Sequence, residues 1–186
     1  MKVSMIMRGL VLLIVIAGCS TKTPEQRFTD YVNDPDNKIT QVIKIGETQA
    51  TIKLLTKEYR YFMDSMSAGK PDTSEEKYYY FNIRFDKNVG DKLEKEKMLY
   101  LNFDMQNDFV MLRNTDSVPA AICQKIENGK GGSFEYIVAF EKGTDKHQAD
   151  DFTVFYNDKI FGIGSVAFVY REKDIEKIPA LKTKSD

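Results

Sequence analysis

From residue 38 onward, hydrophobic side chains recur at every second position, and this alternation restricts the fold more than any other feature of the sequence. In one segment Tyr79, Phe81, Ile83 and Phe85 fall on one face, while the residues between them fall on the other. A period of two is the pattern of a β-strand with one buried face. The alternation recurs in Ala50, Ile52 and Leu54; in Phe134, Tyr136, Val138 and Phe140; in Phe152, Val154 and Tyr156; and in Val166, Phe168 and Tyr170. The sequence therefore predicts an all-β domain.

The segments between these runs contain turn-forming residues, and none holds an amphipathic helix of the length that a βαβ unit needs. Segments 39–45 and 50–55 are joined by Gly46-Glu47-Thr48, which predicts a β-hairpin. About 7–9 short antiparallel strands in one domain indicate a sandwich or a barrel. The spacing is uneven, with longer crossings near 64–77 and 86–97, so we expect the sandwich.

Residues 91–105 are expected to return to the sheet after one of these crossings. The segment 91–97 is rich in Lys and Glu, which suits either a helical turn or a solvated loop. Beyond it, Leu99, Leu101, Phe103 and Met105 alternate with polar residues. This alternation predicts another strand.

A short helix is one of two interpretations of residues 23–32. Thr23, Pro24 and Gln26 form a capping box with proline at the first helical position. Phe28 and Val32 then fall on one face, as does Tyr31, before the turn at 33–35. The alternative is a disordered linker that extends to about residue 37.

The first 19 residues have the layout of a secretory signal. Lys2 and Arg8 give a cationic start, residues 10–17 are apolar, and Gly18 precedes Cys19. The ending Ile16-Ala17-Gly18-Cys19 resembles the lipobox of bacterial lipoprotein precursors. The resemblance implies cleavage before Cys19 and lipidation of that cysteine. Because serine and not aspartate follows the cysteine, it also implies the outer membrane, facing the periplasm, with surface exposure left open.

The expected organisation is a signal peptide at 1–18, a lipidated tether at 19–37, a β-sandwich at 38–179 and a polar tail at 180–186. Removal of Lys2 and Arg8 leaves 25 basic and 28 acidic side chains, so electrostatics gives no reason to expect a nucleic-acid partner. With Cys19 lipidated, Cys123 has no partner for an intramolecular disulfide. Its apolar neighbours favour a small buried side chain over a reactive thiol.

The last part of the chain supports a second resemblance. Segment 134–140, segment 151–156, Gly162-Ile163-Gly164 and a final strand are similar in pattern to the immunoglobulin-like (telokin-like) domains of small bacterial lipoproteins. The likeness implies an immunoglobulin-like sandwich and assigns no activity.

Catalytic and metal-binding patterns are weak throughout. Asp145, His147, Asp150 and Asp151 lack a recognised ligand spacing, and a solvated loop explains them. Segment 34–37 imitates the start of a calcium loop without its glycine and closing glutamate. A bulge or close strand packing explains Gly162 and Gly164 better than phosphate binding does. We expect no enzyme activity, no cofactor and no metal.

One outward face favours a binding function. If strands near 78–84 and 100–104 are neighbours, their outward side chains form one surface: Tyr78, Tyr80, Arg84, Tyr100 and Asn102. Tyrosine and arginine are enriched at protein contacts, although a cross-strand tyrosine ladder or a covering amino-terminal helix also explains them.

Two functions remain open. The chain is either a non-enzymatic lipoprotein that binds another envelope protein, or a periplasmic lipoprotein that binds a ligand or inhibits a hydrolase. A flat tyrosine-bearing face favours the first. A deep apolar pocket between the sheets, or a protruding loop at 128–133, favours the second.

Overall fold

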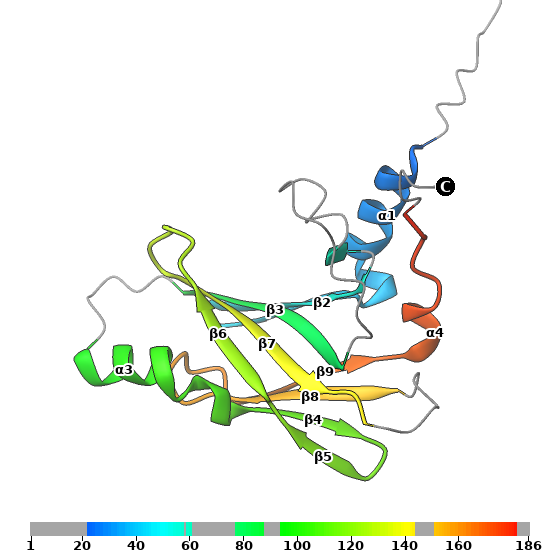
Figure 1. Cartoon of the computed structure of the whole chain (residues 1–186). Helices are drawn as coiled ribbons and strands as arrows, with labels where there is room; N and C mark the ends of the chain where they lie inside the picture. The colour runs from blue at the N-terminus through cyan, green and yellow to red at the C-terminus, as the bar shows by residue number, and fades with distance from the viewer. Residues whose placement is uncertain (1–21, 58, 61–76, 88–93, 144–150, 182–186) are drawn as a thin grey trace, which may run out of the picture.

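The computed structural model describes residues 22–57, 59–60, 77–87, 94–143 and 151–181. Within these residues two antiparallel sheets pack face to face, which confirms the predicted β-sandwich (Figure 1). One sheet has five strands in the order β1-β2-β3-β7-β6, and the other has four in the order β5-β4-β8-β9. The strands are β1 (Thr40–Ile45), β2 (Thr48–Leu55), β3 (Tyr78–Lys87), β4 (Phe109–Arg113), β5 (Asp116–Pro119), β6 (Ile122–Ile126), β7 (Ser133–Glu141), β8 (Phe152–Asn157) and β9 (Ser165–Tyr170).

The five-stranded sheet follows the predicted alternation. In the register of β2, β3 and β7, Ile52 lies opposite Ile83, which in turn lies opposite Tyr136. The predicted hairpin joins β1 to β2, and Gly46 in its turn has φ 58°, a left-handed conformation that glycine adopts without strain.

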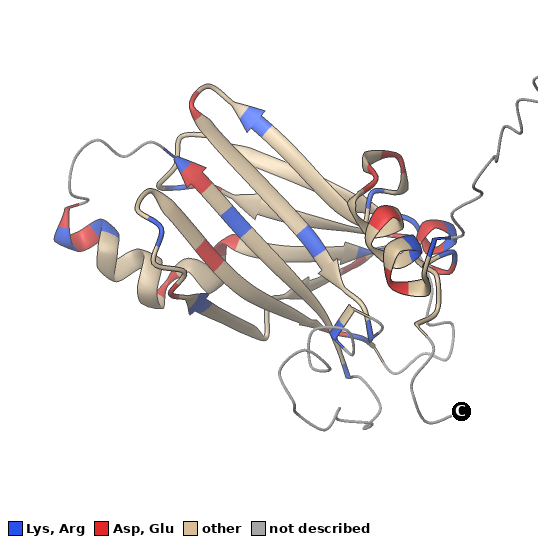
Figure 2. Cartoon of the chain, turned by 90° about the horizontal axis from the view of Figure 1, so that it is seen from above, with Lys and Arg blue, Asp and Glu red and all other residues tan. Residues whose placement is uncertain are grey.

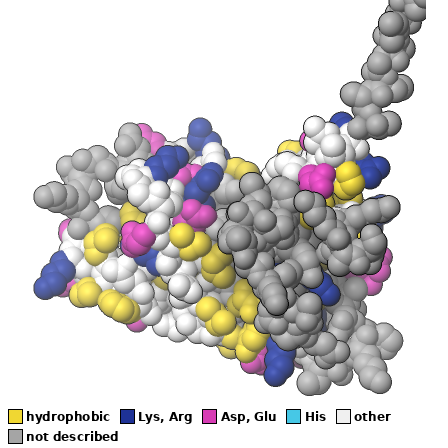
Figure 3. Space-filling view, turned by 45° about the horizontal axis from the view of Figure 1, so that its top comes forward, with side chains coloured by type: hydrophobic (Ala, Val, Ile, Leu, Met, Phe, Trp, Pro, Cys, Tyr) yellow, Lys and Arg dark blue, Asp and Glu magenta, His cyan; other side chains and the backbone are white. Residues whose placement is uncertain are grey.

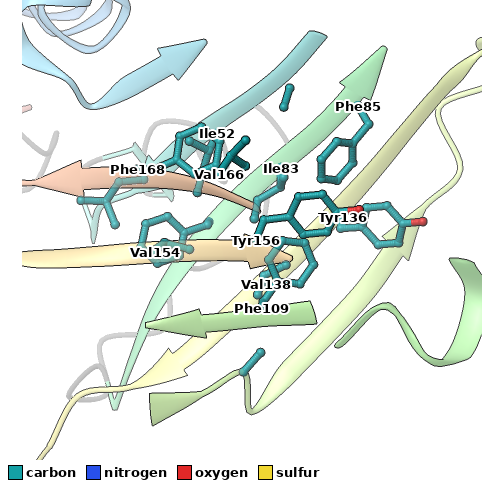
Figure 4. Packing of buried hydrophobic residues seen from close by; sticks show 14 of the residues in the cluster. Ile52, Ile83, Phe85, Phe109, Tyr136, Val138, Val154, Tyr156, Val166 and Phe168 are labelled. Atoms are coloured by element: carbon teal, nitrogen blue, oxygen red, sulfur yellow. The ribbon is translucent and has the colours of Figure 1, made fainter. Parts of the chain in front are cut away.

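Aromatic rings fill the space between the sheets (Figure 4). Phe85 from the five-stranded sheet lies 4.7 Å from Tyr156 of the other sheet, measured between ring centroids. Phe85 also stacks on Phe161 at 4.5 Å, and Phe109 stacks on Tyr156 at 4.9 Å. Offset ring pairs at these separations add stabilisation beyond the area that they bury.

The amino-terminal helix is present and docked. Helix α1 (Pro24–Asn33) has the capping box, with the Gln26 N–H donating to Thr23 Oγ1 at 3.2 Å. Phe28 and Val32 are buried, and the Tyr31 hydroxyl donates to the Asp174 carbonyl at 2.7 Å. This bond fastens α1 to the carboxy-terminal segment around helix α4 (Glu172–Ile175). No helix among the described residues is both long and apolar enough to cross a bilayer.

The strand predicted at 99–105 is wrong. Residues 95–103 form helix α3 (Lys95–Phe103), followed by the 3₁₀ turn η2 (Met105–Asp108). Leu101 and Met105, four residues apart, are buried, whereas Leu99 and Phe103 are 47% and 76% exposed. One side of a helix collects residues at this spacing, so the apparent alternation was a helical face. Of the two interpretations of segment 91–97, the helical one is correct from Lys95 onward.

Candidate interaction surface

The outer face of the five-stranded sheet brings together three of the five predicted contact residues. Tyr78, Tyr80 and Arg84 occupy alternate positions of β3 and are half-buried. The Tyr78 and Tyr80 rings meet edge to face at 6.0 Å, and the Arg60 guanidinium lies 4.8 Å from the centre of the Tyr80 ring. Contacts of this kind hold a ring in one orientation.

Polar and charged side chains on this face contact one another, and Figure 2 shows acidic and basic residues along the strands seen from above. Asn82 donates to the Glu135 carboxylate at 2.7 Å, and Arg84 Nε lies 2.9 Å from the Asp86 carboxylate. Burial lowers the pKa of Lys53 and the Arg84 charge lowers it further. The face is therefore only partly hydrated.

An uncharged row crosses the same face. The register places Ile122 opposite Ala139, Ala139 opposite Tyr80, and Tyr80 opposite Leu55. Ala139 is fully buried although it points away from the core, and Ile122 is 38% exposed. Figure 3 shows hydrophobic side chains gathered beside charged ones on the side of the molecule that it presents. The face thus has an apolar row bordered by paired polar groups.

Tyr100 and Asn102 do not join this surface, because they lie on α3 and not on a neighbouring strand. The Tyr100 hydroxyl lies 2.6 Å from both carboxylate oxygens of the buried Asp108. Lys159 Nζ reaches the same carboxylate at 2.7 Å and the Tyr100 oxygen at 2.9 Å. Burial raises the pKa of Tyr100, and its bond to Asp108 raises it further. Asn102 accepts a bond from Lys125 Nζ at 3.2 Å. These contacts fasten α3 to the sandwich.

The other residues considered as possible sites have structural roles, where the structure describes them. Cys123 is half-buried, and burial raises the pKa of its thiol to about 12. In segment 34–37, which is similar to the start of a calcium loop, Asp34 caps the 3₁₀ turn η1 (Pro35–Asn37) by accepting a 3.0 Å bond from the Asp36 N–H.

The prediction of a bulge or close strand packing at Gly162 and Gly164 is wrong, since a Cβ at either position would meet no atom within 4 Å. They lie instead in the β8–β9 turn, with φ 78° and 69°. Cys19 and His147 lie outside the described residues, within which no group of three metal-ligating side chains occurs.

The alternative function depends on a pocket or a loop. The buried rings described above occupy the space between the sheets. A surface hollow of about 290 Å³ lies at the Tyr78 end of β3 and is lined by Tyr79, Lys142, Glu176 and Ile178 among others. The β6–β7 loop protrudes in Figure 1, and Asn128 holds it through bonds to Ser133 and Glu135. The hollow is mixed in character, with charged and apolar side chains in its lining.

Comparisons with known proteins add little to this geometry. No protein-family model and no curated protein matches the sequence. A solved structure of a DUF4426 family protein from Pseudomonas aeruginosa PAO1 is 10% identical with a TM-score of 0.39, over 72% of this chain and 92% of its own. A novel protein of unknown function from Burkholderia pseudomallei K96243 is 9% identical with a TM-score of 0.42, over 83% and 89%. Likenesses this distant carry no argument about function, and the immunoglobulin-like and lipobox resemblances stay predictions.

Proposed function

We propose that this chain is a lipid-anchored lipoprotein of the outer membrane that binds another envelope protein and performs no catalysis. The sequence Ile16-Ala17-Gly18-Cys19 supports the anchor. Acyl chains stabilise membrane association by about 0.8 kcal/mol per buried methylene, and two or more chains together anchor a protein stably.

The start of α1 limits how far the domain extends from this anchor. Only Ser20, Thr21 and Lys22 separate Cys19 from the capping residue Thr23, a span of roughly 15 Å when fully extended. Because α1 packs on the sandwich through Phe28 and Val32, the domain follows the helix. The proposed anchor therefore holds the sandwich close to the bilayer, in reach of other membrane-bound proteins.

The observation that carries the binding function is the apolar row through Tyr80 on the outer face of the five-stranded sheet. Protein interfaces have an uncharged centre rich in aromatic side chains and a polar rim. Tyr80 is such an aromatic. Asn82 stands in the neighbouring row, and Arg84 and Glu135 lie opposite each other in the row beyond it, with partners on the same face. Since these charges are already paired, the partner we expect supplies an apolar side chain for the Tyr80 row and uncharged hydrogen-bonding groups for the rim.

Site-directed crosslinking in cells tests this function. A photo-crosslinking amino acid replaces Tyr80 in the full-length chain, and adducts are identified by mass spectrometry. The matched control places it at Glu127, whose side chain is 84% exposed at the end of β6. We expect an adduct with one envelope protein from position 80 and none from position 127.

The second control is Cys19→Ala, which removes the proposed site of lipidation. If the protein is anchored as proposed, this variant loses radiolabelled palmitate, leaves the membrane fraction and no longer forms the adduct. Absence of an adduct from position 80 in the properly anchored chain would refute the binding function. Retention of palmitate in Cys19→Ala would refute the anchor.

A further inference from the structure

Strand β6 forms a free edge of the five-stranded sheet. It is the last strand in the order β1-β2-β3-β7-β6, and in Figure 1 no strand lies beyond it. Among the residues that the structure describes, β6 pairs with β7 alone. A strand edge without a neighbour presents a row of N–H and C=O groups to which another strand can bond.

The register defines which residues of β7 bond to β6. On its other side, β7 bonds to β3 through its even-numbered positions. At one end of this pair the Lys142 N–H donates to the Lys77 carbonyl at 2.8 Å, and at the other end the Lys87 N–H donates to the Gly132 carbonyl at 2.8 Å. In an antiparallel sheet both backbone groups of a residue point to the same neighbouring strand, and successive residues alternate between neighbours. The odd-numbered residues of β7 therefore bond to β6.

The same alternation applies to β6 itself. The positions that lie opposite odd-numbered residues of β7, and so bond to it, are Ile122, Gln124 and Ile126. Cys123 and Lys125 thus turn their N–H and C=O groups to the free edge, where no described group bonds to them. Just before the strand, Ala121 also donates to the Ala139 carbonyl, so a bulge precedes the free edge and does not interrupt it.

Strand β6 has few of the features that protect an edge from a further strand. Proline and unsatisfied inward charges are two such features. Its five residues contain no proline, and its one charged residue, Lys125, lies on the inner face opposite Tyr136. The Lys125 ammonium is 2.9 Å from the Glu127 carboxylate and 3.2 Å from the Asn102 amide oxygen. An added strand therefore does not have to supply a partner for this charge.

The apolar row through Tyr80 ends at this edge. Ile122 is the member of the row on β6, next to Ala139, and is 38% exposed. A strand beyond β6 places one of its side chains beside Ile122, and cross-strand neighbours of this kind stabilise a sheet. The other outward residues of β6 are Gln124 and Ile126, so the next two outward side chains of an added strand meet a polar and then an apolar neighbour.

We propose that an extended segment of the partner protein adds to β6 as a further strand of this sheet. The inference rests on the proposed binding function and says how the partner is held. The unpaired backbone groups of an edge select one chemistry, an extended peptide, and the alternate side chains of that peptide give specificity. The outward residues of the segment should be apolar, polar and apolar, beside Ile122, Gln124 and Ile126. Its backbone supplies the uncharged hydrogen-bonding groups that the paired charges of the face require.

Photo-crosslinking in cells locates the segment. A photo-crosslinking residue replaces Gln124 in the full-length chain, and the matched control places it at Val42, which is 56% exposed on β1 at the opposite edge of the sheet. A second copy with a different tag is expressed alongside. We expect position 124 to give an adduct with the protein that position 80 captures, through a segment with the apolar, polar, apolar spacing. Position 42 should give none.

Proline at an edge position tests whether the backbone makes the contact. Because the Lys125 N–H points away from β7, Lys125→Pro breaks no bond of the sheet but removes a donor to the added strand. It should lower the adducts from positions 80 and 124 at least tenfold. Lys125→Ala loses the same side-chain contacts and should leave both adducts unchanged. Circular dichroism and urea unfolding check that both variants fold, and Cys123→Pro against Cys123→Ala makes the same comparison if Lys125→Pro does not.

Several outcomes would overturn the added strand. A Tyr80 adduct without a Gln124 adduct, or adducts insensitive to proline in a folded chain, would refute it and leave the proposed function standing. An equal loss in Lys125→Ala would assign the effect to the side chain. An adduct that carries both tags would assign the edge to a second copy, and equal adducts from positions 42 and 124 would indicate random collision. An adduct from position 124 alone would support the strand and refute the contact at Tyr80, whereas no adduct from either position would refute the proposed function itself.

Discussion

The Asp158 carboxylate makes the structure's most concentrated set of described hydrogen bonds, and its removal should be costly. It accepts bonds from the N–H groups of Ile160 at 2.9 Å, Phe161 at 2.7 Å and Ile163 at 2.7 Å. It also accepts the Tyr156 hydroxyl at 2.9 Å. The turn between β8 and β9 is thus organised around a single side chain.

The turn supports the core as well as the surface. Phe161 within it is 2% exposed and stacks on Phe85 with an interplanar angle of 13°. A bond to a charged group stabilises a protein by about 1.5–3 kcal/mol. Four such bonds set an upper limit, and water replaces part of them because the carboxylate is only half-buried. We expect Asp158→Ala to lower the free energy of unfolding by about 3 kcal/mol, which corresponds to a Tm roughly 6–12 °C lower for a chain of this length.

The pH dependence follows from the same contacts. Burial raises the pKa of Asp158, but the N–H groups of Phe161, Ile163 and Ile160 and the Tyr156 hydroxyl lower it by more, so it lies below its ordinary 3.8. A folded pKa below the unfolded one contributes stability above the unfolded pKa, and this stability is lost as pH falls through the folded pKa. The advantage of the native chain over Asp158→Asn should therefore be full at pH 7 and shrink below about pH 4.

Urea unfolding of the mature chain at pH 7 and at pH 3, followed by tyrosine fluorescence and circular dichroism, measures both effects. Asn157→Ala is the matched control, because this neighbour is exposed and bonds to Ser165 outside the turn's centre. A loss below about 1 kcal/mol for Asp158→Ala, the size of a single ordinary hydrogen bond, would refute the reasoning. So would an advantage over Asp158→Asn that does not change with pH.

Three further predictions concern single contacts. Tyr100→Phe leaves buried Asp108 with fewer donors and should cost about 1–3 kcal/mol in urea unfolding; no change would mean that Lys159 and water suffice. Thr23→Ala removes the cap bond to the Gln26 N–H and should cost about 1 kcal/mol, seen as faster amide exchange at the start of α1; unchanged exchange would contradict it. The Cys123 thiol, with its pKa raised to about 12 by burial, should react with maleimide at pH 8 only after unfolding; rapid labelling of the folded chain would contradict it.

The sequence was informative where one face of a strand is apolar and the other polar. In β3, buried Phe81 and Ile83 alternate with Tyr80 and Asn82, so both the strand and its inward face could be predicted. The capping box before α1 was equally direct, because Thr23 and Gln26 satisfy backbone groups that only a helix start leaves free.

Helix α3 could not be separated from a strand by the pattern alone. Leu99, Leu101, Phe103 and Met105 satisfy a period of two and also contain two pairs four residues apart. Tertiary packing decides between them by burying only Leu101 and Met105. Because Tyr100 and Asn102 lie in this segment, the wrong periodicity removed two residues from the predicted face.

Strands β4, β5 and β6 were not predicted, and for β4 the reason is different. Phe109-Val110-Met111-Leu112 is apolar on both faces, so it has no alternation to detect. The feature that hid β4 from the pattern is the same one that makes the outer face of its sheet uncharged. The alternation of apolar and polar residues is expected to fail where a surface serves binding as well as folding.

The edges of the two sheets favour the faces as contact surfaces. On one side of the sandwich, Gln41 of β1 donates to the Val169 carbonyl of β9 at 3.0 Å and so ties two edge strands together. On the other side, β5 is four residues long and ends in Pro119, which lacks an N–H for a further strand. Tied and shortened edges resist extension of a sheet by another chain. Besides the free edge of β6, the described strands therefore present two outer faces to partners, one with polar contacts around an apolar row and one without charge.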